Sequence, residues 1–328
     1  MRLLGRLGIE RGTAVEIVRR YGLVILFAVF LAVLITVSPS FRSLPNLINL
    51  LQQNAIFGIV ACGMLLMIIV GGFDLSVGSV AALSGVAAAV LFVNVPTFGI
   101  PIGFTVGLVA GLVVGVANGF LIAKVGINPF IATLGMQILV RGLLFIATDA
   151  RPIYGLPMSY TFVGLGRIGG VPVATLIFVA VLVAIFVLLR FTQLGHYMYA
   201  VGGDREAARL NGIPVERVTI TAYAIGGTLA ALGGLVLLGQ TNIGQPAVAE
   251  MWPLFIIAIV VLGGTPLTGG VGGISAVLLG TFILGTISNA LNLFNASPYW
   301  QPAITGAILI ASVALERYGS RLHHVTRR

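Results

Sequence analysis

The chain has 328 residues, of which 58% are hydrophobic and only 8% are charged. Soluble domains carry roughly 25% charged residues, so this composition excludes a soluble protein and indicates an integral membrane protein. The formal net charge of +9 does not indicate a nucleic-acid partner, because the arginines lie between and outside the apolar runs, as membrane topology requires. The single cysteine, Cys62, lies inside an apolar run, so no disulfide can form within the chain.

Residues 1–20 combine five arginines with two glutamates, a pattern that predicts a cytoplasmic amphipathic segment. The apolar run that follows lacks a small-residue cleavage site, so we interpret it as a retained span and not as a signal peptide. Predicted spans cover residues 21–37, 49–70, 75–93, 98–121, 128–148, 172–190, 217–239, 252–263, 270–291 and 299–315.

These spans predict an all-α fold, a polytopic transmembrane helix bundle of about ten spans with glycine-broken segments. When ten spans are counted, most arginines and the lone lysine, Lys124, fall on the side of both termini. Both termini are therefore predicted to be cytoplasmic. The transmembrane domain is predicted to cover residues 21–316 and a basic cytoplasmic tail residues 317–328.

The first glycine break, at 70–79, lies between the second and third predicted spans, and a second break follows at 262–270. Both contain the pattern Gly-Gly-x-x-Leu-Ser/Thr-x-Gly, and span counting places both on the cytoplasmic side. Unwound backbone at membrane depth persists only when it is buried in protein or faces a water-filled cavity. Within the first break, Asp74, just before Leu75 and Ser76, either caps the following helix or contacts an ion or substrate.

The fourth span carries a glycine at every fourth position. These residues fall near one helix face, which predicts a smooth groove where another backbone packs closely. The residues are Gly103, Gly107, Gly111, Gly115 and Gly119.

The fifth span places Thr133, Gln137 and Arg141 on one face, because they are spaced by four residues. An arginine this deep is costly unless it meets water, a carbonyl or a carboxylate, and Asp149 and Asp74 are its candidate partners. Arg141 therefore either lines a solute path or forms a structural pair, and the sequence leaves both alternatives open.

The longest predicted outer loop covers residues 149–171. It offers Arg151, Tyr154, Tyr160 and Arg167 as contacts for a soluble partner, although an inert solvated loop would carry the same residues.

The longest polar interruption of the chain, at 197–217, lies between two predicted spans. A short helix is predicted from Asp204, a favourable N-cap, to Leu210, and Gly212 followed by Pro214 would end it. A charged helix in this position is expected to dock on a partner protein. The docking residues are predicted to be Gly203, Asp204, Arg205, Glu206, Ala207, Ala208, Arg209, Asn211 and Gly212.

Most other polar side chains in the spans are uncharged amides, which join helices or hydrogen-bond the hydroxyl groups of a neutral solute. The predicted solute path therefore comprises Asn54, Asp74, Ser76, Asn118, Thr133, Gln137, Arg141, Asn242, Gln245 and Asn289.

The sequence has no phosphate-binding loop of the Gly-Lys-Ser/Thr type, because its only lysine, Lys124, follows an alanine. No cluster of His, Cys or Asp has metal-ligand spacing, so no metal is expected. A proton- or sodium-driven carrier usually needs carboxylates in its spans, and Asp74 alone offers little support for one. An intramembrane enzyme is weakly supported, because no nucleophile has a base nearby in sequence.

Three segments together resemble bacterial ABC sugar permeases of the ribose, xylose, arabinose and galactofuranose group. They are GGFDLSVGS at 71–79, NPFIATLG at 128–135, and AVGGDREAARLNGI at 200–213, which VLGGT at 261–265 continues. The resemblance runs from about residue 45 to 315. Phe73 stands where the family signature usually has isoleucine.

The resemblance implies an inner-membrane permease subunit that imports a monosaccharide by alternating access. It also implies three protein partners: a second permease subunit, a periplasmic sugar-binding protein, and a cytoplasmic ATPase. ATP and magnesium would bind the ATPase, with no cofactor on this chain. Residues 204–212 would then be the coupling helix that docks on the ATPase. The alternatives are an ion-coupled carrier or channel for a small neutral polar solute, and an intramembrane enzyme.

Overall fold

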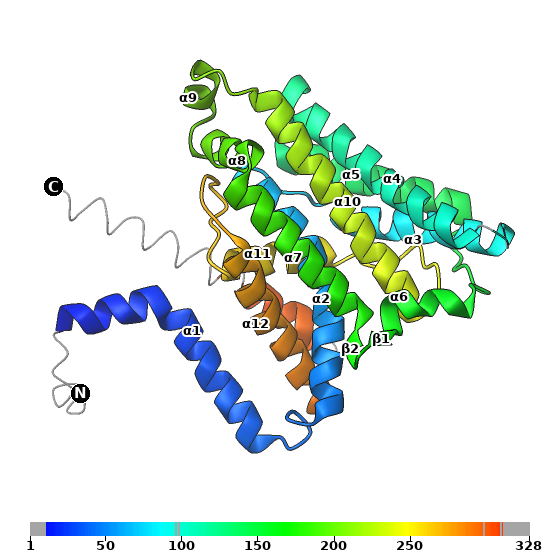
Figure 1. The fold of residues 1–328 in the computed structure, drawn as a ribbon, viewed down its shortest axis with the longest axis horizontal. Helices are drawn as coiled ribbons and strands as arrows, with labels where there is room; N and C mark the ends of the chain where they lie inside the picture. The colour runs from blue at the N-terminus through cyan, green and yellow to red at the C-terminus, as the bar shows by residue number, and fades with distance from the viewer. Residues whose placement is uncertain (1–10, 96, 98, 298, 309, 311–328) are drawn as a thin grey trace.

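The computed structural model describes residues 11–95, 97, 99–297, 299–308 and 310. The predicted amphipathic segment 1–20 therefore lies partly outside the described residues, and the predicted basic tail 317–328 lies wholly outside them. The described chain is almost entirely helical (Figure 1). Its elements are α1 (Arg11–Val37), α2 (Leu44–Ile69), α3 (Val77–Asn94), α4 (Gly99–Phe120), the π-helix η2 (Leu121–Val125), α5 (Pro129–Thr148), the 3-10 helix η3 (Met158–Tyr160), α6 (Thr161–Leu165), β1 (Arg167–Ile168), β2 (Val171–Pro172), α7 (Val173–Phe191), α8 (Gln193–Gly203), α9 (Arg205–Leu210), α10 (Val215–Thr241), α11 (Trp252–Leu262) and α12 (Ile274–Leu293).

Seven of the described helices are long and apolar enough to cross a membrane: α2, α3, α4 with η2, α5, α7, α10 and α12. The apolar part of α1, Val24–Val37, and α11 are shorter. The helical transmembrane bundle is thus confirmed, while the count of about ten spans and the side of the termini stay predictions. A two-stranded antiparallel hairpin, β1–β2, interrupts the predicted all-α pattern.

The centre of the bundle is built by α2 and α10. Ile59 and Val60 of α2 are fully buried. The two helices approach so closely that a Cβ at Gly63 would lie 2.9 Å from Cα of Gly226. On the periphery, α5 and α7 expose large apolar side chains such as Ile146. A surface of this kind suits lipid hydrocarbon, in which the backbone polar groups are satisfied within each helix.

The glycine stripe of α4 packs on neighbouring backbones, as predicted. A Cβ at Gly111 would overlap the Gly227 carbonyl oxygen and the Ala231 methyl group, and a Cβ at Gly115 would overlap the Tyr223 carbonyl oxygen. Small residues on both sides let helix axes approach closely, which increases dispersion contacts where lipid removes the hydrophobic driving force. The stripe therefore fixes α4 against α10.

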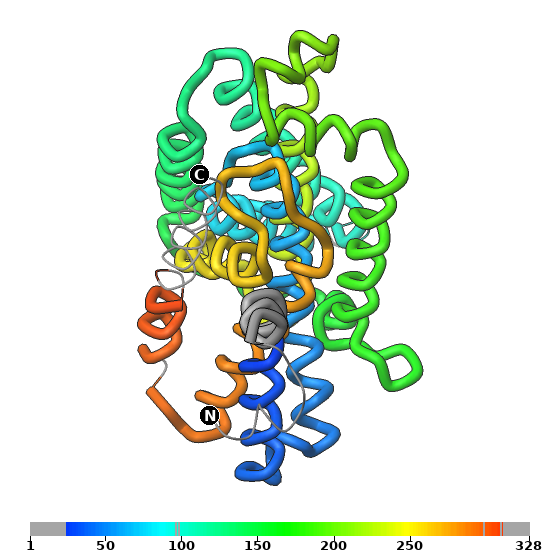
Figure 2. The backbone as a smooth tube through the Cα atoms, turned by 90° about the vertical axis from the view of Figure 1, so that its left-hand side faces the viewer, coloured from blue at the N-terminus to red at the C-terminus, as the bar shows by residue number. Residues whose placement is uncertain are grey.

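The predicted outer loop is more ordered than an inert loop. Tyr160 is buried and donates its hydroxyl to the Leu235 carbonyl of α10 at 3.0 Å, so its predicted contact with a soluble partner is wrong. Gly164 of α6 packs against Gly239. Figures 1 and 2 both show this α6–hairpin end and the α9 end at opposite ends of α7 and α10. The two regions predicted to contact soluble partners thus lie far apart.

Candidate coupling site and buried polar clusters

Helix α9 forms where the sequence predicts a short capped helix. Asp204 is the N-cap, and its Oδ1 accepts hydrogen bonds from the backbone amides of Glu206 at 3.0 Å and Ala207 at 2.9 Å. The helix ends in a Schellman motif, because the Ile213 amide donates to the Ala208 carbonyl and Gly212 adopts a φ of 77°. Local sequence therefore determines both ends of α9.

Arg209 ties α9 to the start of α10. Its guanidinium lies 3.2 Å from Glu206 Oε2 and 3.0 Å from Glu216 Oε1. Exposed pairs of this kind contribute about 0.2–1 kcal/mol each, so they orient α9 more than they stabilise it. The contact with Glu216 joins α9 to the first turn of α10.

Most residues of the predicted docking set are exposed: Gly203, Asp204, Arg205, Glu206, Ala207, Arg209, Asn211 and Gly212. Ala208 is 4% exposed, so its predicted contact with a partner is corrected: it packs inward and supports the helix. Leu210, which the sequence analysis omitted, is 80% exposed at the tip of α9. The sequence feature that could have identified Leu210 is an apolar residue between Arg209 and Asn211, in a helix that is too short to have an apolar stripe.

The chain passes from α8 into α9 at a place where three segments meet, which we call the glycine junction. They are the end of α2 at 69–71, the end of α8 at 202–203 and the loop between α11 and α12 at 269–270. The Tyr199 hydroxyl of α8 also donates to the Gly272 carbonyl at 2.9 Å. Both glycine breaks of the sequence are therefore in contact with each other and with the base of α9.

Contacts in the glycine junction join backbone to backbone. The Gly270 amide donates to the Ile69 carbonyl at 2.9 Å. A Cβ at Gly269 would lie 2.9 Å from Cα of Gly71, and a Cβ at Gly270 would lie 2.8 Å from Cα of Gly203. Gly269 and Gly270 have φ values of 83° and 74°, which side chains disfavour. These segments therefore pack backbone on backbone, with no flexible side chain between them.

Asp74, Ser76 and Asn118 from the predicted solute path form one buried cluster. Asp74 Oδ1 accepts hydrogen bonds from the amide and the hydroxyl of Ser76, both at 2.6 Å. Asn118 Nδ2 of α4 donates to Ser76 Oγ at 2.9 Å and to Asp74 Oδ2 at 3.3 Å. All three residues are fully buried. Asp74 therefore closes the turn that precedes Ser76, the N-cap of α3. Its contact with an ion or substrate stays a prediction.

Arg141 does not pair with either carboxylate that the sequence suggested. Its Nη1 donates to the Pro246 carbonyl in the segment before α11, and Glu250 is the acidic group whose charge acts on it. Its Nη2 is buried without a hydrogen-bond partner among the described residues. The correction has a physical reason: Asp74 is enclosed in its own cluster, whereas a backbone carbonyl lies within reach of Arg141.

The remaining residues of the predicted solute path do not meet at one site. Asn289 exchanges two hydrogen bonds with Asn46, at 2.9 and 3.1 Å, and so joins α12 to α2. Thr133 bonds its own helix at Pro129. Asn54 packs on α12, with its Nδ2 buried and unpartnered among the described residues.

Two of the path residues lie near the outer loop. Asn242 contacts the Met158 sulfur at 3.5 Å, and Gln245 is exposed. Gln137 is half-buried on α5.

The other three predicted contacts for a soluble partner, Arg151, Tyr154 and Arg167, are all exposed at the α6–hairpin end. The paired backbone of Ile153 and Gly244 ties their loop to the segment that follows α10. Among the described residues, no group of three or more His, Cys, Asp or Glu could hold a metal ion.

The fold and the site define a polytopic membrane protein with an exposed, rigidly mounted helix at one end. The chain belongs to the family described as the permease component of branched-chain amino acid transport systems, which it matches over residues 46–313. This membership makes the chain a transport subunit rather than an enzyme. Together with the relatives that follow, it confirms the resemblance to ABC sugar permeases.

Three relatives illustrate the similarity. The chain is 43% identical over 284 residues to the ribose import permease protein RbsC of Bacillus subtilis, covering 85% of this chain and 87% of that protein. It is 41% identical over 299 residues to the L-arabinose transport system permease protein AraH of Escherichia coli, covering 91% and 90%. It is 37% identical over 293 residues to RbsC of Escherichia coli, covering 88% and 90%. No solved structure matches the chain.

Proposed function

We propose that this chain is the transmembrane subunit of an ATP-driven importer that moves a neutral monosaccharide across the bacterial inner membrane. The names of its relatives, which are ribose and L-arabinose permeases, support a sugar of this kind. The predominance of amides over charges among the polar span residues supports a neutral solute.

The observation that carries the proposal is the way in which α9 is exposed on one side and held at its base. This helix presents charged side chains and Leu210 to the outside, while its base is fixed in the glycine junction. An ATPase that grips α9 would displace α2, α8 and the loop before α12 together. ATP and magnesium belong to that partner, and its closure would open the solute path to the other side.

Two further partners complete the proposed complex. A periplasmic sugar-binding protein would dock at the α6–hairpin end on Arg151, Tyr154 and Arg167, which are exposed there. A second permease subunit would complete the solute path. The half-buried or exposed polar residues Gln137, Arg141, Asn242 and Gln245 remain candidates for contact with the solute.

The test is sugar uptake into proteoliposomes that contain the chain with its ATPase and binding protein. Leu210→Asp should abolish ATP-driven uptake and weaken co-purification of the ATPase, because burying a leucine contributes about 1.5–3 kcal/mol to an interface. Leu165→Asp, at an exposed leucine of the opposite end, is the matched control and should keep the ATPase bound.

One uptake result would contradict the proposal. If the chain alone concentrated sugar when driven by an ion gradient, it would be a secondary carrier. In that case Leu210→Asp would leave uptake unchanged.

A further inference from the structure

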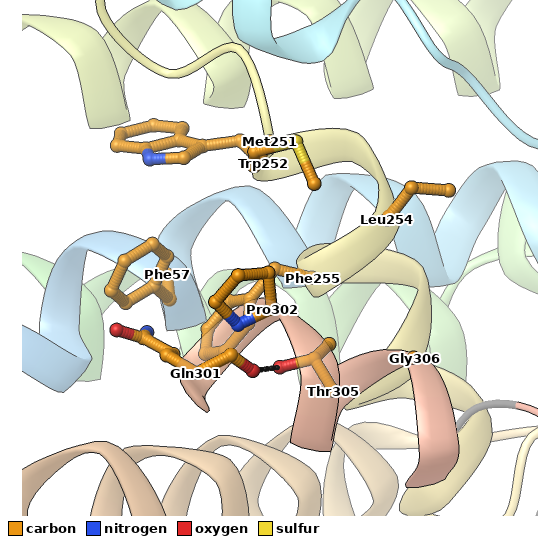
Figure 3. Close-up of a pocket in the computed structure, with 9 residues that line it drawn as sticks. All are labelled: Phe57, Met251, Trp252, Leu254, Phe255, Gln301, Pro302, Thr305 and Gly306. Atoms are coloured by element: carbon orange, nitrogen blue, oxygen red, sulfur yellow. Dashed lines mark hydrogen bonds between the residues drawn. The ribbon is translucent and has the colours of Figure 1, made fainter. Parts of the chain in front are cut away.

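A pocket of about 270 Å³ lies between α2, α11 and the helical residues 300–308 (Figure 3). Three aromatic rings wall it: Phe57 lies 5.4 Å from Trp252 and 4.7 Å from Phe255, measured between ring centroids. Gln301 lines the same pocket, and Figure 3 shows its amide beside Phe57. None of these residues entered the predicted solute path.

The lining combines apolar faces with a few polar atoms and no charge. Trp252 and Gln301 are half-buried and bring two polar donors, the indole N–H and the side-chain amide, to the pocket lining. The hydrogen bond from the Thr305 hydroxyl to Gln301 uses the backbone carbonyl and not this amide. In a groove filled by a lipid acyl chain these donors would stay unsatisfied, which costs free energy. A charged solute would find no counter-charge there. The lining therefore suits a small neutral molecule with both an apolar face and hydroxyl groups.

The position of the pocket suits a solute path. Helix α11 has 11 residues, too few to cross a membrane, and non-helical segments flank it on both sides. Figures 1 and 2 show it midway between the α9 end and the opposite end of the molecule. Broken helices near the middle of the bilayer are where transporters commonly build solute sites. The loop that leaves α11 enters the glycine junction at 269–270, so movement of α9 would reach the pocket wall.

We propose that this pocket is a sugar subsite on the translocation path. The rings of Phe57, Trp252 and Phe255 contact the C–H face of a monosaccharide, and the Gln301 amide hydrogen-bonds its hydroxyl groups. The inference rests on the proposed function, because it takes the imported solute to be a neutral sugar. It adds the residues that hold the sugar between the two faces of the membrane.

Fluorescence tests binding directly, because the chain has two tryptophans, Trp252 and Trp300. Trp300 is exposed and does not line the pocket, so Trp300→Phe leaves Trp252 as the only reporter. We expect a saturable change in Trp252 emission when D-ribose or L-arabinose is added to this variant of the purified full-length chain, without the ATPase and the binding protein, so that no tryptophan of a partner contributes. Gln301→Leu should weaken that response at least tenfold, because the hydroxyl groups lose their partner.

Transport separates the subsite from the overall function. In the reconstituted importer, Trp252→Leu should lower sugar uptake roughly tenfold and Trp252→Phe should restore most of it, because phenylalanine keeps an aromatic face. ATP hydrolysis and thermal stability, measured on both variants, should stay near the unsubstituted values. Trp300→Phe should transport normally.

Two results would overturn the subsite. In the first, the unsubstituted importer moves sugar and both Trp252→Leu and Gln301→Leu move it equally well, which leaves the proposed function standing. In the second, an acyl-chain probe saturates the emission change and sugar has no effect. An importer that moves no neutral monosaccharide would instead refute the proposed function, and the fluorescence titration would still decide the pocket.

Discussion

Gly202→Ala perturbs the glycine junction at its tightest point. The added methyl group would overlap the Ile69 carbonyl oxygen and lie 2.6 Å from the Gly270 nitrogen. It would therefore break the hydrogen bond between these two groups, worth about 1 kcal/mol. Forcing a methyl group into close-packed surroundings costs about 1–3 kcal/mol, so the expected loss is about 2–4 kcal/mol. Gly203→Ala is the matched control, because a Cβ there has open space around it.

Two measurements decide the outcome. Thermal unfolding of the purified chain should have a lower midpoint for Gly202→Ala than for Gly203→Ala. In the assembled importer, Gly202→Ala should hydrolyse ATP while moving less sugar per ATP, because α9 no longer displaces the segments of the junction. If Gly202→Ala and Gly203→Ala gave equal midpoints and equal sugar-to-ATP ratios, the reasoning about the junction would be refuted.

Three further predictions concern single contacts. Asp204→Ala should cost about 1 kcal/mol of α9 stability and speed hydrogen exchange at the amides that Asp204 caps; unchanged exchange would contradict the cap. Gly111→Val should lower the unfolding midpoint through overpacking of about 1–3 kcal/mol or more, whereas Gly135→Ala, which has open space around its Cβ, should not. Asn46→Ala and Asn289→Ala should couple by about 0.6 kcal/mol in a double-mutant cycle of unfolding free energies, and strict additivity would argue against their paired hydrogen bonds.

Features determined by neighbouring residues were predictable from the sequence. The cap at Asp204 and the end of α9 at Gly212 depend on side-chain and backbone bonds within a few residues. The α4 stripe was readable because a period of four residues by itself fixes a helix face. In each case the chemistry lies within one element.

Features that depend on distant contacts were not predictable. Arg141 and Pro246 are 105 residues apart in the sequence, and no local pattern pairs a guanidinium with a particular carbonyl. The repeated glycine pattern suggested two similar breaks, yet nothing in it indicated that Gly71 and Gly269 touch. Phe57 and Trp252 looked like ordinary apolar positions until the fold placed their rings on one pocket.

The backbone-to-backbone packing of α4 on α10 limits which helices can move relative to each other during a transport cycle. Interlocked backbones with no side chain between them cannot slide past one another without first separating. We therefore expect α4 and α10 to travel as one rigid body. Probes attached to these two helices should report a constant separation throughout turnover, while the conformational change occurs elsewhere in the bundle.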